Sequence, residues 1–316
     1  MPDEGPEMKI ETFEAKSIIR QERRSSDIHM NPYQGCYHDC VYCDGKAERY
    51  YMHEDYGTRI RVKVNAPAML EEHLKKKGFL PVNRAKTGTL LDYVPEKKRT
   101  FRKERFTINI SGGVCDVYQP AEAVVQMSRK LLQIVYDYEF PVFLLTKNKL
   151  VLRDIDLLKK INEKARATVC MSISLSDDGM AKLFEPRAST TGERFETLRA
   201  LHEAGVHTGI WFMPILPWIA DSEENIDSVF ERARGAGVEY IDCGGLTLKP
   251  GRQKEGFFKV IEAHFPELLI TYKLLYGNDD KYGAPDRTQI RKLEVADLRA
   301  RVKGAGERYG MKVWTW

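Results

Sequence analysis

Three cysteines stand close together near the start of the chain, in the stretch NPYQGCYHDCVYCDG at residues 31–45. Three residues separate Cys36 from Cys40, two separate Cys40 from Cys43, and no fourth cysteine follows nearby. Cysteine thiolates are strong ligands for zinc and for iron–sulfur clusters. The spacing therefore predicts a metal centre with three thiolate ligands and one coordination position left for another group.

Two kinds of metal centre are compatible with this spacing. A structural zinc site takes four ligands, and either His38 within the loop or His53, ten residues after Cys43, would complete a Cys3His set. A [4Fe–4S] cluster normally takes four thiolates, so three would leave one iron open to an external ligand. The zinc hypothesis would make the chain a zinc-stabilised nucleic-acid-binding protein rather than an enzyme.

The segments around this loop predict an α/β fold with a parallel sheet. Segments of helical character separate successive apolar, β-rich runs, which occur at 27–33, 106–111, 141–147, 167–175, 207–216 and 240–248. Alternating strands and helices are typical of a parallel sheet, whose functional loops follow the carboxyl ends of the strands. The three-cysteine loop directly follows the first run, so we expect it at the functional end of the sheet.

Helix boundaries are also indicated. One helix is predicted to begin at Pro120, because apolar residues between 121 and 135 recur at spacings of three and four. The pairs Thr190–Glu193 and Asp221–Glu224 resemble capping boxes that begin two further helices.

Composition limits the class of protein. A chain of 316 residues with 42% hydrophobic residues can bury a large core. The start has no apolar segment typical of a signal peptide, and the longest apolar run, 209–220, is interrupted by Pro214 and Pro217. Six cysteines in such a chain favour metal or redox chemistry in a reducing compartment. We therefore expect a cytoplasmic protein without membrane contact.

The net charge of +4 is unevenly distributed. Between Lys75 and Arg105 the chain has eleven Lys or Arg against three Asp or Glu, a local charge of +8. Such a segment suits the binding of phosphates in a nucleic acid. A solvated basic surface would have the same composition.

The motif Cys36-x3-Cys40-x2-Cys43, with Tyr42 just before the last cysteine, resembles the radical S-adenosylmethionine (SAM) superfamily. The resemblance implies a partial (β/α)6 barrel of the TIM type over residues 27–250. An N-terminal arm at 1–26 would precede it, and a C-terminal extension at 251–316 would pack on it.

The same resemblance implies the cofactors and the chemistry. The three cysteines would hold a [4Fe–4S] cluster whose open iron binds SAM, and a reducing partner such as ferredoxin or flavodoxin would supply the electron. Members of the family cleave SAM to a 5′-deoxyadenosyl radical that abstracts a substrate hydrogen.

Five further segments are similar to the spore photoproduct lyase-like branch of this superfamily: ISGGVCDVYQPAE, FLLTKN, SISLSDD, FEPRASTTGERFETLRALHEAGV and MPILPWIADSEENI. The similarity runs from about residue 28 to residue 248. It implies a DNA lesion repair activity, with the basic segment 75–105 holding the DNA backbone. A radical SAM enzyme acting on a small molecule, a peptide or an RNA base is the alternative.

The resemblance also implies a set of cofactor-binding residues, namely Tyr42, Gly112, Gly113, Asp116, Lys147, Ser172 and Ser174. The two glycines match a pair whose backbone meets the amino group of the cofactor, and Lys147 matches a lysine that pairs with its carboxylate. Ser172 and Ser174 alternate along one predicted strand and so face the same side. We expect one of these two serines to be a ligand.

Cys115 falls where the lyases keep a cysteine that returns a hydrogen atom to the substrate radical. A thiol suits this role because its S–H bond is weak. Most free cysteines are small buried hydrophobic residues instead, and we assign Cys170 and Cys243 to that class.

The chain departs from the lyases at Asp44, where they have a tyrosine that takes part in hydrogen transfer. A carboxylate cannot relay a radical in that way. Tyr50, Tyr51 or Tyr56 would have to supply the ring instead.

Overall fold

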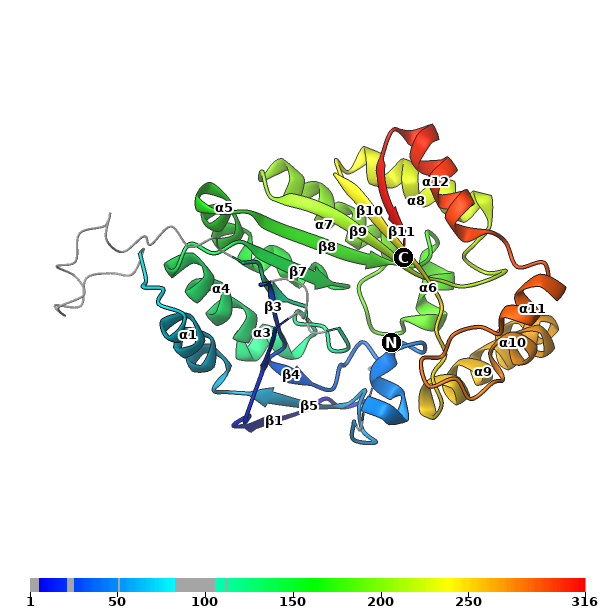
Figure 1. Cartoon of the computed structure of the whole chain (residues 1–316), viewed down its shortest axis with the longest axis horizontal. Coiled ribbons are helices and arrows are strands. Elements are labelled where there is room, and N and C mark those ends of the chain that lie inside the picture. Colours follow the sequence, from blue (N-terminus) through cyan, green and yellow to red (C-terminus); the bar gives the residue numbers. More distant parts are fainter. Residues whose placement is uncertain (1–5, 22–25, 51, 83–105, 112, 316) are drawn as a thin grey trace.

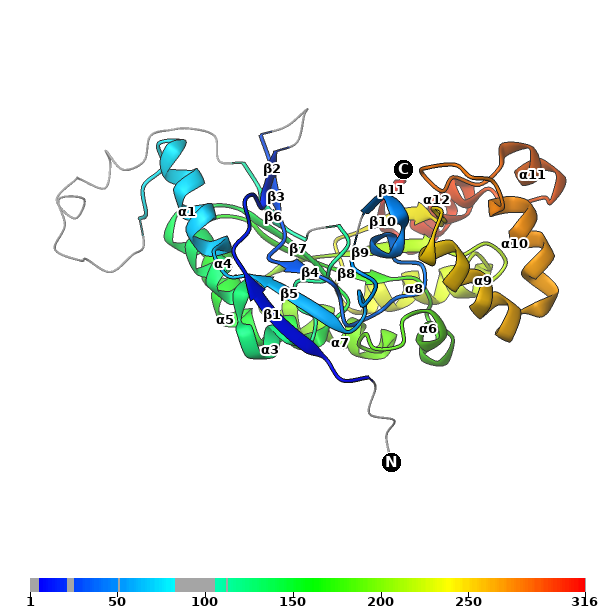
Figure 2. The ribbon, with the colours of Figure 1, turned by 90° about the horizontal axis from the view of Figure 1, so that it is seen from below.

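A curved parallel sheet forms the centre of the molecule, as seen in a computed structural model that describes residues 6–21, 26–50, 52–82, 106–111 and 113–315. Helices α4, α5, α7 and α8 lie on the outer face of this sheet (Figure 1). Helix α1 and helices α9 to α11 lie at opposite ends of the molecule (Figure 1, Figure 2). The inner face of the sheet is thereby left for the three-cysteine loop.

The strands of the large sheet follow the order β2-β3-β6-β7-β8-β9-β10-β11. Neighbouring strands from β3 to β11 are parallel, and β2 is antiparallel to β3. Their bounds are β2 Ile19–Gln21, β3 Ile28–Met30, β6 Ile108–Ile110, β7 Val142–Thr146, β8 Ala167–Ile173, β9 His207–Ile215, β10 Tyr240–Gly245 and β11 Lys312–Thr315.

The described α-helices lie between strands of the large sheet along the chain. They are α1 Ala66–Lys76, α3 Ala121–Val125, α4 Met127–Asp137, α5 Ile155–Lys164, α6 Asp178–Phe184, α7 Thr191–Glu203, α8 Glu223–Gly235, α9 Arg252–His264, α10 Leu269–Tyr276, α11 Arg287–Lys292 and α12 Leu298–Tyr309.

The predicted fold class is confirmed. Each of the six predicted runs contains one parallel strand of the sheet, β3 or β6 to β10. The alternation of strands and helices produces an α/β fold with the curvature of a partial TIM-type barrel (Figure 1). Two strands extend the sheet beyond the predicted six, since β2 pairs with β3 and β11 pairs with β10.

A second, small sheet lies beside the three-cysteine loop. It has the order β1-β5-β4, with bounds Lys9–Phe13, Arg59–Lys63 and Tyr33–Gln34. Figure 2 shows β1 and β5 running side by side across the molecule. The chain from β4 through the three cysteines to β5 is therefore a long loop whose two ends lie in this sheet.

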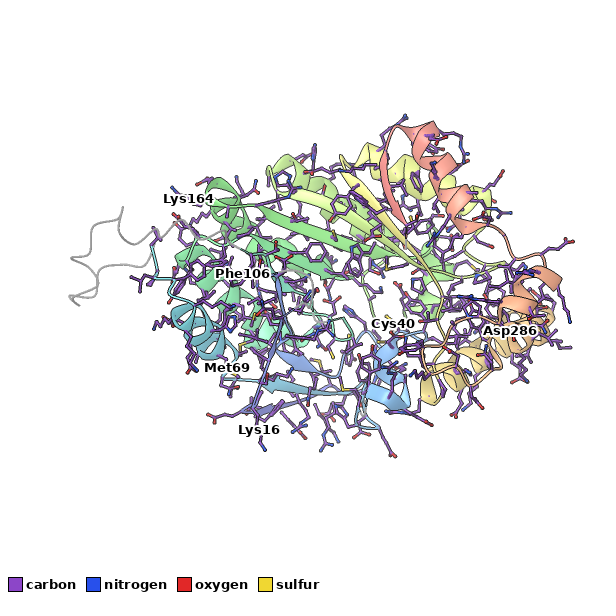
Figure 3. All side chains as sticks on the ribbon, in the orientation of Figure 1. Lys16, Cys40, Met69, Phe106, Lys164 and Asp286 are labelled. Atoms are coloured by element: carbon purple, nitrogen blue, oxygen red, sulfur yellow. The ribbon has the colours of Figure 1, made fainter. Side chains whose placement is uncertain are left out.

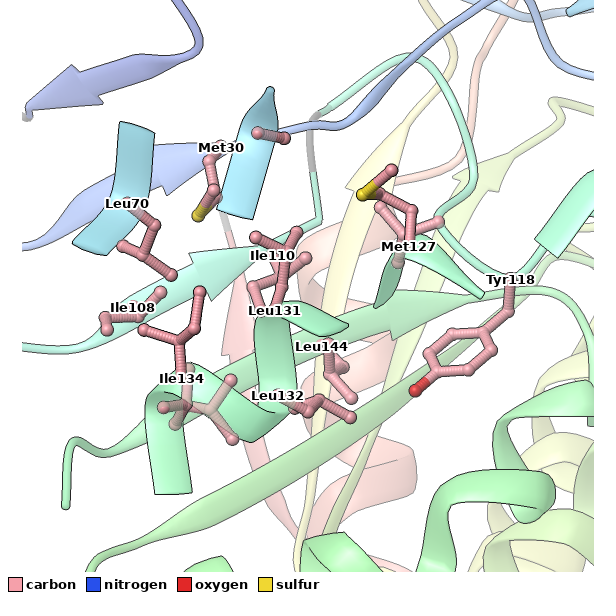
Figure 4. Packing of buried hydrophobic residues seen from close by; sticks show 14 of the residues in the cluster. Met30, Leu70, Ile108, Ile110, Tyr118, Met127, Leu131, Leu132, Ile134 and Leu144 are labelled. Atoms are coloured by element: carbon pink, nitrogen blue, oxygen red, sulfur yellow. The ribbon is translucent and has the colours of Figure 1, made fainter. Parts of the chain in front are cut away.

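The core lies between the large sheet and its outer helices. In Figure 4, Ile108 and Ile110 of β6 face Leu131 of α4 and Leu70 of α1. These four side chains are fully buried. Burial of one such side chain contributes about 1.5–3 kcal/mol, so this packing holds the strand ends, and the loops after them, in fixed positions.

The prediction of a single helix beginning at Pro120 is wrong. The structure has two helices, α3 and α4, separated by Gln126 in the left-handed conformation with φ of 52°. The fully buried carboxylate of Glu122 accepts hydrogen bonds from the backbone N–H groups of Met127 and Ser128. A side chain in α3 thus caps α4, which ends one helix and begins the next.

One predicted capping box is confirmed and the other is wrong. The Thr190 hydroxyl accepts a hydrogen bond from the Glu193 backbone N–H, and the Glu193 carboxylate accepts one from the Thr190 backbone N–H. Helix α8 is capped one residue later than predicted, by Ser222, whose hydroxyl accepts from the backbone N–H of Asn225. Within the described ranges, no helix is both long enough and apolar enough to cross a membrane.

Candidate active site

The loops that follow the parallel strands line a cavity of about 280 Å³. The three-cysteine loop forms one wall, and the carboxyl ends of β6 to β10 form the other. Figure 3 shows Cys40 near the middle of the molecule, beside the sheet. Residues that line the cavity include Cys36, His38, Cys40, Tyr42, Cys43, Asp44, Gly113, Cys115, Asp116, Lys147, Ser172, Trp211 and Thr247.

Most of the residues predicted from the sequence are therefore neighbours of one cavity. Ser174 is not among the lining residues, and Gly112 lies outside the described part of the chain. Gly113 has a φ of 76°, a conformation that favours glycine, and no atom lies within 4 Å of the place where a Cβ would stand. Its backbone consequently borders open space in the cavity.

The three clustered cysteines carry free thiols. Cys36 and Cys40 are buried, and Cys43 is partly buried. Burial raises the pKa of the Cys40 thiol to about 12 and also raises the pKa values of Cys36 and Cys43. The thiols are thus neutral in the metal-free protein, and binding of a metal must release protons from them.

The first half of the loop is fastened by two side chains from other parts of the chain. The buried Gln119 accepts from the backbone N–H of Tyr37 at 2.9 Å and donates to the Gly35 carbonyl at 3.0 Å. Arg187 donates to the carbonyls of Tyr37 and Gly57 at 2.6 and 2.8 Å. These bonds hold the loop in place without any metal.

His38 is engaged with the strand ends rather than with the cysteines. Its Nδ1 lies 3.4 Å from Oδ2 of Asp116, and its Nε2 lies 3.3 Å from Nδ2 of Asn148. Burial raises the pKa of Asp116, but the proximity of His38 and hydrogen bonds from the Thr146 hydroxyl and the Lys147 backbone N–H outweigh it, so this pKa is lowered. His38 is therefore not placed as a fourth ligand.

The metal chemistry of the loop fits a cluster better than a single ion. His53 does not line the cavity, and among the residues that the structure describes no three Cys, His, Asp or Glu side chains converge on one metal position. A zinc ion needs such convergence. In a four-iron cluster each thiolate binds a separate iron, so three cysteines around one cavity suffice.

Lys147 carries a positive charge into the cavity from the end of β7. Its Nζ lies 2.5 Å from the Ser172 hydroxyl and 3.7 Å from Oε1 of Glu185. Ser174 instead contacts the Tyr42 hydroxyl at 3.2 Å, beyond the end of β8. Of the two serines, Ser172 lines the cavity and Ser174 does not.

Glu185 is a residue that the sequence argument did not single out. Its fully enclosed carboxylate accepts from the Tyr42 hydroxyl and forms an ion pair with Arg194. Burial raises the pKa of Glu185, but the charges of Arg194 and Lys147 outweigh that effect and lower it. Both Glu185 and Arg194 belong to the segment FEPRASTTGER, which is similar to the lyases.

Cys115 lines the same cavity as the three clustered cysteines. Its Sγ lies 3.8 Å from the hydroxyl of Tyr56, which in turn lies 3.4 Å from Sγ of Cys43. Burial raises the pKa of Cys115 to about 12, so Cys115 is a neutral thiol that retains its S–H hydrogen. Cys170 and Cys243 are buried and do not line the cavity.

The basic segment is only partly described. Lys75 and Lys76 end helix α1 and form surface ion pairs with Glu71 and Glu72 at 3.0 and 2.7 Å. The remainder of that segment from residue 83 to residue 105 lies outside the described residues.

Comparison with known proteins gives a family match and several relatives. The model of the radical SAM superfamily matches residues 30–226. An uncharacterized protein of Mycobacterium tuberculosis is 25% identical over 282 residues, which cover 88% of this chain and 75% of the relative.

Two solved structures share the fold. A spore photoproduct lyase complexed with dinucleoside spore photoproduct is 16% identical and has a TM-score of 0.62. The alignment covers 97% of this chain and 81% of the lyase. SuiB of Streptococcus suis bound to its precursor peptide SuiA is 12% identical, with a TM-score of 0.51 over 91% of this chain and 48% of SuiB. At such identities the likeness concerns the fold alone.

Proposed function

Because the chain belongs to the radical SAM superfamily, which uses a [4Fe–4S] cluster and SAM, we propose that this radical SAM enzyme is a lyase of the spore photoproduct type that repairs a pyrimidine lesion in DNA. When bound, the cluster and SAM supply the electron and the 5′-deoxyadenosyl radical that abstracts a substrate hydrogen. The remaining steps belong to residues of the chain.

Cys36, Cys40 and Cys43 are the proposed cluster ligands, since all three line one cavity, and the His38 ring at that cavity faces Asp116 and Asn148. Lys147 is the proposed partner of the SAM carboxylate, and its contacts with Ser172 and Glu185 orient its ammonium group. Tyr42, Gly113 and Asp116 are the further cofactor contacts that we propose from the cavity lining.

The observation that carries the lyase proposal is the position of Cys115. Its thiol lies at the cavity with the proposed cluster ligands, and the Tyr56 hydroxyl lies behind it at 3.8 Å. In the proposed step the S–H bond breaks, a C–H bond forms on the product radical, and a thiyl radical remains on Cys115. Tyr56 then returns a hydrogen atom to the sulfur, and one electron from the reducing partner with one proton from solvent restores the phenol.

The proposed substrate is a lesion flipped out of a DNA strand, because a base stacked inside a duplex cannot enter a cavity between the loops. The basic segment 75–105 supports this choice through its charge. A radical SAM enzyme acting on a different substrate is the second candidate. Asp44 favours it, since this carboxylate lines the cavity where the lyases have a tyrosine.

The test is the ratio of repaired product to 5′-deoxyadenosine, with dinucleoside spore photoproduct as substrate. We expect the Cys115→Ala variant to keep forming 5′-deoxyadenosine while repaired product falls, because abstraction does not use the thiol. Cys170→Ala, a buried cysteine away from the cavity, is the matched control. An unchanged ratio would remove Cys115 from the mechanism, and absence of turnover by the wild type would favour another radical substrate.

A further inference from the structure

The second half of the three-cysteine loop is held by the segment that leads into the C-terminal extension. We propose that Lys249, Gly251, Arg252 and Gln253, here called the polar clamp, position this loop and set the charge beside Cys43. The inference rests on the proposed role of Cys36, Cys40 and Cys43 as cluster ligands. It gives the start of the extension a part in the chemistry of the site.

Gln253 fixes both neighbours of Cys43. Its fully buried amide Nε2 donates to the Tyr42 carbonyl at 2.7 Å and to Oδ1 of Asp44 at 3.0 Å. Its Oε1 accepts from the Lys249 backbone N–H at 2.8 Å. A buried amide is costly unless it is hydrogen-bonded, so these bonds hold the backbone on either side of the third cysteine.

Lys249 places a buried positive charge next to Asp44, the residue that follows Cys43. Its side chain is 8% exposed, and its Nζ lies 2.6 Å from Oδ1 of Asp44, which is 32% exposed and lines the cavity. Nζ also lies 3.2 Å from the Thr247 hydroxyl. A buried charge that loses its partner is strongly unfavourable, so Lys249 and Asp44 keep each other in place.

Arg252 and Gly251 fasten the chain beyond the loop. The Arg252 guanidinium donates to the carbonyls of Glu54 and Met52 at 2.6 and 3.0 Å. Gly251 has a φ of 97°, and a Cβ there would stand 2.6 Å from Cγ of Glu48. The absence of a side chain at Gly251 lets the Glu48 backbone N–H reach the Pro250 carbonyl at 3.2 Å.

The clamp complements the supports of the first half of the loop. Gln119 and Arg187 hold the backbone around Tyr37, and Gln253 holds it around Cys43. Metal ligands work best when residues behind them fix their orientation. Charges and hydrogen bonds around cluster ligands also set the reduction potential, and Lys249 forms its ion pair with Asp44, the residue that follows Cys43.

The experiment uses the full chain reconstituted anaerobically with iron and sulfide, and it measures the reduction potential and the iron bound per protein. Lys249→Met should shift the potential to more negative values, because the Asp44 charge is then uncompensated. Asp44→Asn should shift it in the opposite direction, and the double variant should return toward the wild type. Lys249→Arg keeps the positive charge and should have the same reduction potential as the wild type.

Lys259→Ala is the matched control, because it removes the same charge from an exposed position on α9 and should leave the potential unchanged. Gln253→Leu should lower the iron retained per protein several-fold. Circular dichroism of the cluster-free variants establishes folding, and if Gln253→Leu does not fold, the Lys249 and Asp44 potentials decide the matter. Potentials equal to that of Lys259→Ala in all these variants would overturn the clamp. A wild type that binds no iron would instead overturn the ligand assignment.

Discussion

Lys147 is enclosed by Ser172, Glu185 and the ring of Tyr42, so its ammonium group is oriented and partly desolvated. An ion pair with a carboxylate is worth about 1–3 kcal/mol under such conditions. We therefore expect Lys147→Ala to weaken SAM binding about tenfold or more while leaving the cluster intact. Equilibrium binding to the reconstituted protein measures this effect.

Lys149→Ala is the control for that variant, since Lys149 is an exposed lysine two residues away that pairs with Glu193. It should bind SAM as the wild type does. Equal affinities for the wild type and Lys147→Ala would show that the lysine has another role.

Residue types and spacing indicate the three clustered cysteines from the sequence alone, whereas Cys115 and Lys147 are implied by the resemblance of their segments to the lyases. The sequence alone does not indicate the roles of Tyr56 and Glu185. Tyr56 is one of three tyrosines that local sequence cannot rank, and its contact with Cys115 joins residues 59 positions apart. Glu185 gains its role only when Tyr42, 143 positions away, reaches it.

At the scale of elements, Glu122 decides where helix α4 begins. Its buried carboxylate accepts from two backbone N–H groups at the start of α4 and pairs with Arg153 at 2.7 Å. Removal of one partner of a buried pair typically costs about 3–5 kcal/mol. We expect Glu122→Ala to lower the free energy of unfolding by about 3 kcal/mol or more, measured by urea denaturation of the cluster-free protein.

An exposed glutamate provides the comparison for Glu122. Glu163 lies on the exposed side of α5, and Glu163→Ala should change stability by less than about 0.5 kcal/mol. If the two variants unfold at the same urea concentration, the carboxylate of Glu122 does not hold the two helices in place.

Elements with strong periodicity could be predicted, whereas those defined by distant partners could not. The six strands of the barrel are apolar runs of the expected spacing. Strand β11 has four residues at the end of the chain, and its partner β10 lies about seventy residues earlier. Periodicity cannot indicate the break at Gln126, because apolar spacing continues through it, while the buried cap from Glu122 is a tertiary feature.

At the scale of the whole molecule, Asp116 and Glu185 make the free energy of unfolding depend on pH. Both are buried, and neighbouring charges and hydrogen bonds lower their pKa values despite that burial. A carboxylate whose pKa is lowered in the folded protein stabilises the fold at pH values above its unfolded pKa, which is about 4. This contribution is lost as the pH falls from there through the folded pKa. We expect the free energy of unfolding of the cluster-free protein to decrease steadily below about pH 5.

Urea denaturation at several pH values measures that dependence. Glu185→Gln should make the decrease shallower, whereas Glu163→Gln, at an exposed position, should leave it unchanged. Stability that stays constant or rises on acidification would contradict the assigned charge states.

The central claim is that Cys36, Cys40 and Cys43 hold the cluster with which this chain cleaves SAM. The most direct measurement is 5′-deoxyadenosine formed from SAM by the reduced, anaerobically reconstituted protein, together with its iron content. We predict that the wild type and Cys243→Ala form 5′-deoxyadenosine, and that Cys36→Ala, Cys40→Ala and Cys43→Ala do not. Cleavage retained in all three single variants, or a colourless wild type that contains zinc, would contradict the account.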